Sequence, residues 1–298
     1  MQFMLNGYTG RCKLDSYATM MTSYSLSVAT NVIKSQASIP LWRNKKFNRI
    51  AGLAVRDYPT YNLSISIEVT ESLLWYLLKK LGKNGCRDSF KVEFIDHAYG
   101  SGLKINMSKC YLTQLDLNIS NNAAATVQLG FAYFEKTFEM DYGKYTTKNK
   151  HNAESTLVGP VLMGYYNFGA KYNSISYGDL YEFSLSYRQP VTPKFGCVGK
   201  STSESNAVDP MKAIFGVPEM TYSLTYVMHD KNKLNNYNLN SNKVANNGYD
   251  LEIYHKGKRR IKLTNCYPDT YTPQLAQNGG ANMFNIEGSV YGSISFNE

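Results

Sequence analysis

The feature that most constrains the fold of this chain is an internal repeat, in which the second half of the sequence follows the first at nearly constant spacing. The clearest pair of segments runs from Ile105 to Tyr111 and from Ile261 to Tyr267. In both, apolar, polar, apolar, small hydroxyl and polar residues are followed by Cys and Tyr without a gap. Such a repeat predicts that one structural unit occurs twice in the chain.

A second pair of segments places a proline directly before an alternating strand. Pro59 precedes alternation from Tyr61 to Val69, and Pro218 precedes the same alternation from Met220 to Met228. Alternation of period two predicts half-buried strands, and a proline just before a strand removes no hydrogen bond from the ladder. The other matching strands are expected at Ser23–Val28 and Glu182–Tyr187, Phe90–Ile95 and Tyr249–Tyr254, and Thr126–Phe138 and Met283–Phe296.

One segment predicts a helix in the first unit only. It begins after Thr70, a good N-cap, and ends at Gly82, a good C-terminal stop. An apolar stripe of helical spacing, which should pack on a sheet, consists of Leu74, Leu77, Leu78 and Leu81. The corresponding Asn-rich stretch of the second unit, Lys231–Gly248, lacks this periodicity and indicates a lost or shortened helix.

These patterns predict a mainly β fold with two tandem domains, each a β-sandwich or partly closed barrel, the first with a flanking α-helix. The domains should span residues 1–140 and 160–298. The polar segment 141–159 lacks alternation and is predicted to be a linker.

The composition limits the class of protein. Five cysteines, an odd number without a C-x-x-C pair, argue against a disulfide framework and a zinc site. Cys110 and Cys266 are instead expected to be buried at the ends of strands. We expect no secretory signal in Met1–Gly10 and no membrane span, because the longest apolar stretch, Leu73–Leu81, is too short.

The sequence contains no recognisable catalytic motif. The four histidines are dispersed, and no H-E-x-x-H, G-x-S-x-G, Walker or dinucleotide-binding pattern occurs. The aspartates of the first half occur singly, without the spacing of a carboxylate pair or calcium loop. We therefore expect no enzymatic activity, no cofactor and no metal.

Two basic clusters are candidate contact sites in a chain of net charge +9. The first consists of Arg43, Lys45, Lys46 and Arg49, interleaved with Trp42 and Phe47. The second, on an expected hairpin, consists of Lys256, Lys258, Arg259 and Arg260. Basic residues with aromatic neighbours can bind nucleic acid, but they can equally bind an acidic protein surface or simply be solvated.

The repeated unit resembles the tail-tube domain of long-tailed bacteriophages, which tube proteins share with the baseplate proteins that start the tube. The resemblance lies in the strand and helix Pro59–Leu81, in the segments Ser108–Tyr111 and Thr264–Tyr267, and in the aromatic strand Gly130–Phe134. It covers nearly the whole chain twice. The missing second helix and the positive net charge depart from the family pattern, because such a tube should have a neutral or acidic lumen.

The resemblance implies a structural virion protein of the tail, made and assembled in the host cytoplasm. Three copies would close a pseudo-hexameric ring, rings would stack, and DNA would pass through without sequence-specific contacts. The implied partners are the sheath, baseplate, terminator and tape-measure proteins. The basic clusters should then lie on the outer wall or between rings, and the lumen should carry Asn, Ser, Thr, Gln and scattered carboxylates, because a basic lumen would hold the DNA backbone.

Three alternatives remain open at the level of the sequence. A baseplate hub or tube-initiator ring would use the same domain in a single ring. A β-sandwich module that binds sugar or protein would carry an aromatic and carboxylate-lined loop set in each copy. A basic DNA-binding protein would bind with steeply salt-dependent affinity.

Overall fold

The structure is a computed structural model that describes most of the β-sheet framework and one helix. The described residues are 10–29, 32–38, 50–56, 60–82, 87–96, 102–120, 123–134, 139–143, 168–172, 175–177, 180–195, 210–227, 248–255, 258–274 and 283–296. They form antiparallel sheet almost throughout, which confirms the mainly β prediction.

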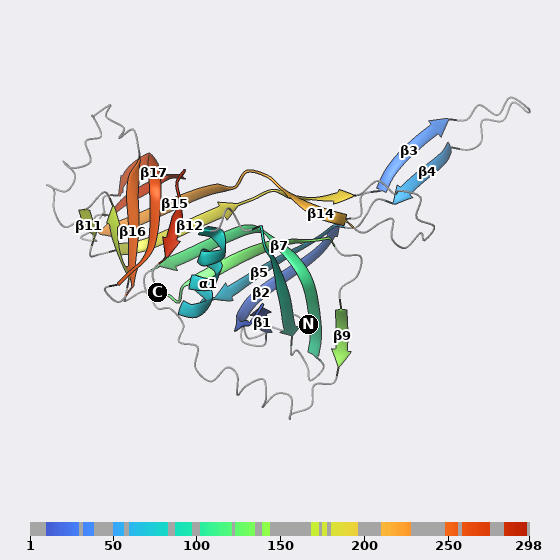
Figure 1. Cartoon of the computed structure of the whole chain (residues 1–298), viewed down its shortest axis with the longest axis horizontal. Helices are drawn as coiled ribbons and strands as arrows, with labels where there is room; N and C mark the ends of the chain where they lie inside the picture. The colour runs from blue at the N-terminus through green and yellow to red at the C-terminus, as the bar shows by residue number, and fades with distance from the viewer. Residues whose placement is uncertain are drawn as a thin grey trace, which may run out of the picture.

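The first half of the chain contributes nine strands and the helix. Their bounds are β1 Gly10–Leu14, β2 Tyr17–Ala29, β3 Val32–Ser38, β4 Ile50–Arg56, β5 Thr60–Glu68, α1 Glu71–Gly82, β6 Ser89–Asp96, β7 Gly102–Ser120, β8 Thr126–Tyr133 and β9 Glu139–Gly143. The β3–β4 hairpin projects from the rest of the molecule (Figure 1).

The second half contributes ten described strands. Their bounds are β10 Phe168–Tyr172, β11 Ile175–Tyr177, β12 Leu180–Arg188, β13 Val191–Phe195, β14 Pro210–Phe215, β15 Glu219–Val227, β16 Tyr249–His255, β17 Lys258–Gln274, β18 Met283–Val290 and β19 Ile294–Phe296. The counterpart of α1 was predicted to be lost from Lys231–Gly248, and all of this segment except Gly248 lies outside the described residues.

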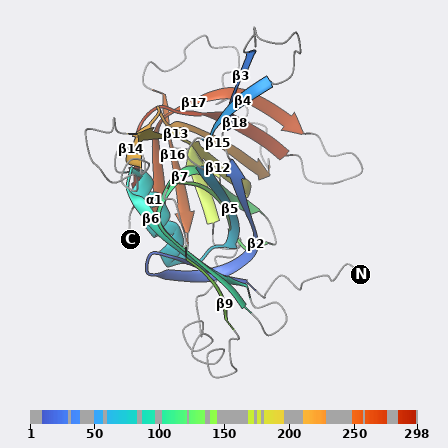
Figure 2. The same ribbon diagram turned by 90° about the vertical axis from the view of Figure 1, so that its right-hand side faces the viewer.

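The strands of the large sheet form two layers, and the long strands β2, β7 and β17 pass from one layer to the other, whereas β3–β4 and β13–β14 form separate two-stranded sheets. The first, here called the eight-strand layer, runs in the order β2, β5, β8, second half of β7, β12, β15, β18, second half of β17. The order from β17 through β12 and β7 to β2 can be followed in Figure 2. The other layer, here called the covering layer, contains β1, β6, β9, β10, β11, β16, β19, α1 and the first halves of β7 and β17.

The core lies between the two layers and extends through both halves as one cluster. In the first half, the rings of Phe90 in β6 and Phe131 in β8 meet edge to face across the layers, 5.5 Å apart. In the second half, Tyr172 of β10 and Tyr222 of β15 meet across the same gap through their hydroxyl groups, 3.2 Å apart.

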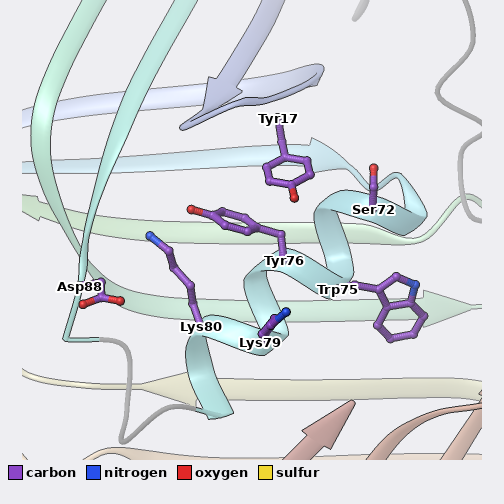
Figure 3. Close-up of a pocket in the computed structure, with 7 residues that line it drawn as sticks. All are labelled: Tyr17, Ser72, Trp75, Tyr76, Lys79, Lys80 and Asp88. Atoms are coloured by element: carbon purple, nitrogen blue, oxygen red, sulfur yellow. The ribbon is translucent and has the colours of Figure 1, made fainter. Parts of the chain in front are cut away.

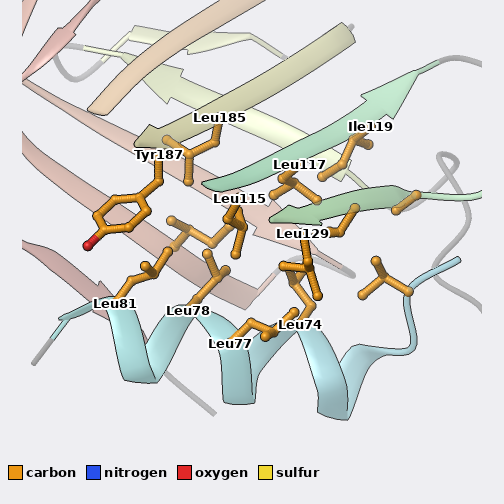
Figure 4. Close-up of a cluster of buried hydrophobic side chains, with 14 of the residues drawn as sticks. Leu74, Leu77, Leu78, Leu81, Leu115, Leu117, Ile119, Leu129, Leu185 and Tyr187 are labelled. Carbon is orange, nitrogen blue, oxygen red and sulfur yellow. The ribbon is translucent and has the colours of Figure 1, made fainter. Parts of the chain in front are cut away.

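The predicted helix is confirmed, with its bounds and its buried stripe. Leu74, Leu77 and Leu78 are fully buried and Leu81 nearly so. The Thr70 hydroxyl accepts a hydrogen bond from the Leu73 amide at 3.3 Å, as an N-cap does. In Figure 4 the stripe faces Leu115, Leu129 and Tyr187, so the helix covers the place where β7 of the first half meets β12 of the second.

The strand pairings of the two halves correspond one by one. β1–β6, β2–β5, β5–β8, β6–β7 and β7–β9 have the same pattern as β10–β16, β12–β15, β15–β18, β16–β17 and β17–β19. The register also agrees at the repeated cysteines. Cys110 pairs with Phe90 and Tyr133, and Cys266 pairs with Tyr249 and Val290.

Irregularities in the ladders fall at matching places as well. In the pairing with β8, the register of β7 shifts between Leu112 and Gln114; in the pairing with β18, that of β17 shifts between Pro268 and Thr270. The pairings β2–β5 and β12–β15 each shift one residue after their first pair, at Met21 and Leu180. Bulges are specific local structures rather than general features of sheets. Their agreement is therefore a more specific similarity between the two halves than the strand order alone.

The two cysteines are buried, as predicted, but they do not end their strands. Cys110 and Cys266 are both fully buried. β7 continues to Ser120 and β17 to Gln274, because at each cysteine the strand loses one partner, β6 or β16, and gains another, β8 or β18. The prediction that each cysteine lies at the end of its strand was therefore wrong.

Two other predicted boundaries change. β8 ends at Tyr133, Phe134 is buried but no longer part of the strand, and the remaining predicted residues, 135–138, lie outside the described residues. β9 contains the first three residues of the predicted linker, and 144–159 also lie outside the described residues.

Candidate assembly site

The first basic cluster, Arg43, Lys45, Lys46 and Arg49, lies outside the described residues, as does Lys256. Lys258 and Arg259 begin β17 in the covering layer, and both side chains are exposed. Arg260 lies in the same strand, although only its backbone is described. The structure therefore brings two described side chains of the predicted clusters together.

The charge of this hairpin is partly balanced by its neighbours. Arg259 donates to the Glu252 carboxylate at 3.2 Å, and Lys262 lies 2.6 Å from Asp250. The hydrogen bond from the Tyr254 hydroxyl and the contact with Arg259 lower the pKa of Glu252, although burial opposes them. Because acidic neighbours already balance these basic groups, the contacts favour a solvated surface cluster and argue against a phosphate-binding site.

The pairing of β7 with β12 joins the two halves through main-chain hydrogen bonds. Seven residues of each strand are in register, from Gln114 opposite Arg188 to Ser120 opposite Glu182. On the core side of this junction, Leu115, Phe183 and Leu185 are 0% exposed. The junction is therefore a continuous piece of sheet with its own buried apolar side.

Four hydrogen bonds converge on the carboxylate of Asp116, on the polar side of the same junction. Arg188 donates to both carboxylate oxygens, at 2.5 and 2.9 Å. Ser186 and Gln114 donate at 2.7 and 2.6 Å. Burial alone would raise the pKa of Asp116, but the hydrogen bonds from Arg188, Ser186 and Gln114 lower it. Asp116 is therefore ionised, and its carboxylate connects the two halves through these hydrogen bonds.

The eight-strand layer ends in two open edges among the described residues. Beyond Met21, β2 is paired with β5 on one edge, and no described strand lies on the other. Beyond Cys266, β17 is paired with β18 on one edge, and no described strand lies on the other. Open edges can pair with further strands, so the layer can be extended at both ends.

The polar face of the eight-strand layer carries mostly neutral side chains. Ser25, Ser64, Gln128 and Ser184 exemplify it, and directly opposite residues place them on one face. The charged residues of these strand segments are six carboxylates and one guanidinium, namely Glu68, Asp116, Glu182, Glu219, Asp269, Glu287 and Arg188. No lysine occurs in these eight segments.

Basic side chains collect instead in the covering layer and at its margins. Those with described side chains are Lys13, Lys79, Lys80, Arg87, Lys91, Lys104, Lys109, Lys171, Lys258, Arg259 and Lys262. Acidic groups in the same part of the chain are Asp15, Glu71, Asp88, Glu93, Asp250 and Glu252. Among the described side chains, positive charge therefore predominates in the covering layer, and negative charge on the polar face of the other layer.

A groove of about 480 Å³ runs along the outer side of α1. It is lined by Tyr17, Ser72, Trp75, Tyr76, Lys79, Lys80 and Asp88 (Figure 3). Asp15, at the β1–β2 turn, accepts hydrogen bonds from the Tyr76 hydroxyl, from Lys80 at 3.2 Å and from the Lys91 amide at 2.8 Å. Burial alone would raise the pKa of Asp15, but these contacts lower it. They connect the β1–β2 hairpin to α1, so the carboxylate of Asp15 has a structural role and does not act as a general base.

Sequence reasoning missed both of these acidic anchors. Local sequence patterns do not link Asp15 or Asp116 to a partner, because Lys80 and Arg188 lie 65 and 72 positions away. The alternation of Glu182–Tyr187 had predicted a half-buried strand, and the matching alternation of Leu115, Leu117 and Ile119 was the available signal that the two strands could share one sheet.

Among the described residues no group of three or more His, Cys, Asp or Glu side chains could hold a metal ion. Across the same residues, the structure contains no helix that is both long enough and apolar enough to span a membrane. A comparison with protein-family models and a search of characterised protein sequences both find no match for this chain.

Proposed function

We propose that this chain is a structural virion protein that forms rings of the tail tube of a long-tailed bacteriophage. Three copies close a ring of six similar units, stacked rings make a conduit, and DNA crosses it during ejection. The proposal assigns the chain no catalytic activity and no cofactor, and it places the protein in the virion after assembly in the host cytoplasm. Sheath, baseplate, terminator and tape-measure proteins are its proposed partners.

The proposal takes the two halves as copies of one partly closed β-sandwich or barrel. The agreement of the registers, and of the bulges after Leu112 and Pro268 and after Met21 and Leu180, supports this interpretation. Unrelated β domains would have no reason to share irregularities at the same places. Each unit then contributes four strands to the eight-strand layer.

The observation that carries the conduit role is the polar face of that layer. A wall in contact with moving DNA must not bind phosphates, because each contact with Lys or Arg adds to a salt-dependent affinity. In a chain of net charge +9, this face has carboxylates in excess and a single arginine, which Asp116 neutralises. The basic residues lie in the covering layer, which would form the outer wall of the proposed tube.

The ring itself follows from the open edges. An interface between unlike surfaces, repeated by rotation, closes a ring and leaves no edge exposed. A helix and a second layer on one side, and a polar face on the other that no described helix or strand covers, allow the sheet to curve around a channel.

Electron microscopy of the purified full-length protein tests the proposal. We expect hollow rings with three-fold symmetry, alone or stacked into tubes, that retain no double-stranded DNA at physiological salt. Rings that never stack, even at high protein concentration, would favour the baseplate hub or initiator. A monomer that binds DNA with a steep salt dependence would overturn the proposal in favour of a DNA-binding protein.

A further inference from the structure

We infer that neighbouring copies of this chain join through β2 of one copy and the second half of β17 of the next, in the register that β12 and β7 use within one chain. The inference rests on the proposal that the two halves are copies of one ring-forming unit. It adds the joining surfaces, the residues on them and their alignment.

The alignment follows from the pairings inside each half. Ser23 and Glu182 both follow the first bulge of their strands, so Ser23–Ala29 corresponds to Glu182–Arg188. Gln114 follows the bulge of β7 in its pairing with β8, and Thr270 follows the bulge of β17 in its pairing with β18. The second half of β17 therefore corresponds to that of β7. Because Asp116 lies opposite Ser186 within the chain, Thr272 of one copy should lie opposite Ser27 of the next.

Burial of corresponding side chains supports these two edges as an interface. Phe183, Leu185 and Leu115 are 0% exposed where β12 and β7 pair. The corresponding residues at the two open edges are Tyr24, Leu26 and Tyr271. Their side chains pack against the same core but are only half-buried. A strand added at each edge would cover these side chains as the junction covers theirs, and a second copy of this chain carries both edges.

The backbone of the junction also predicts which pair of side chains comes closest. The Thr113 carbonyl accepts a hydrogen bond from the Gln189 amide, so residues 113, 115, 117 and 119 direct their backbone groups to the β12 edge. Asp116 and Ser186 are then a pair that exchanges no hydrogen bonds, in which side chains approach most closely. Ser27 and Thr272 inherit this geometry.

Pro273 gives the joint a weaker ladder than the one inside the chain. It corresponds to Leu117, whose amide faces the β12 edge, and a proline has no amide hydrogen to donate there. In the separate chain this position blunts an open edge, as prolines on edge strands do. The missing amide hydrogen therefore weakens the pairing of this edge with any added strand, including the one from the next copy.

Disulfide trapping tests the register in the full-length protein. Ser27→Cys and Thr272→Cys together, with mild oxidation, should give dimers and trimers on a non-reducing gel, with closed trimers predominating at assembly concentrations. The matched control is Ser23→Cys with Thr272→Cys, which uses the same residue types on the same face but is displaced along the strand. The wild type and each single variant control for native cysteines and should remain monomeric on the gel.

The outcomes separate this inference from the proposed function. Rings in the microscope, with trapping in the displaced pair or in neither pair, would overturn the register and leave the ring proposal standing. A protein that light scattering shows to be monomeric at every concentration would overturn both.

Discussion

Asp116 shows how a single carboxylate can hold two halves of a molecule together. Arg188 and Ser186 reach it from the second half, and Gln114 from its own strand. Replacing Asp116 with Asn keeps the shape but removes the charge, so we expect a loss of about 1 kcal/mol in the free energy of unfolding at pH 7, because the pair is partly exposed. Chemical denaturation measures it, and Arg188→Lys, which keeps the charge but not the two-pronged contact, is the matched control.

The pH dependence of this contribution has a defined sign. The pKa of Asp116 is lower in the folded protein than in the unfolded chain. Its stabilisation is therefore present above the unfolded pKa of about 3.9, and it is lost as the pH falls through the lowered folded pKa. The difference between wild type and Asp116→Asn should shrink in acid; a difference independent of pH would show that the charge contributes nothing.

The buried cysteines predict a chemical property. Burial, with a smaller contribution from Glu93, raises the pKa of the Cys12 thiol to about 12, and burial raises that of Cys266 to about 12. Both groups should be protonated and slow to react at pH 8, because the thiolate is the reactive form. In a variant with Cys86→Ser and Cys197→Ser, a thiol reagent should label the native protein far more slowly than the urea-unfolded protein; rapid native labelling would contradict the burial.

At the scale of elements, α1 stabilises both halves of the chain and not only the first half, to which it belongs. Leu78→Ala should lower the free energy of unfolding by about 2–5 kcal/mol, because it removes a fully buried side chain beneath the junction of β7 and β12. The neighbouring exposed substitution Lys79→Ala should stay within about 0.5 kcal/mol. Denaturant unfolding of both variants provides the comparison, and equal losses would contradict the prediction that burial of Leu78 sets its contribution.

The strands show what the sequence could and could not predict. The paired patterns around Pro59 and Pro218, and the leucine stripe, predicted strands and a helix that the structure contains, because both depend on local periodicity. The length of β17 was missed, because Pro268 and Pro273 look like the end of a strand. They are tolerated since one edge of that segment is open. Junctions such as Asp116 with Arg188 depend on chain topology, which local patterns do not encode.

At the scale of the whole molecule, the separation of charge between the layers links composition to the proposed role. The chain is basic overall, yet the eight strand segments of one layer contain only Arg188 as a basic residue. The net charge alone leaves a nucleic-acid partner open, whereas its distribution is the one that the proposed conduit requires, with few basic groups on the wall that DNA would pass.

Transplanting the internal ion pair tests the proposed joint between copies. Thr272 and Ala29 correspond to Asp116 and Arg188. Thr272→Asp with Ala29→Arg should strengthen each joint by roughly 1 kcal/mol relative to the sum of the single variants. Sedimentation across a concentration series measures this as ring formation at lower protein concentration. A double variant that assembles no better than Thr272→Asp alone would argue against the alignment.

The two proposed units belong to one chain and are already joined in it through the pairing of β7 with β12, and this also fixes the arithmetic of the proposed assembly. Half of the joints in a ring would form while each chain folds, at the high effective concentration of a tethered partner. Only the other half would depend on encounters between chains, so the protein concentration at which rings fall apart should be far lower than for untethered units. Whole chains can also supply only an even number of units, so five- and seven-membered rings, the nearest errors to six, are excluded by the parity of the chain itself.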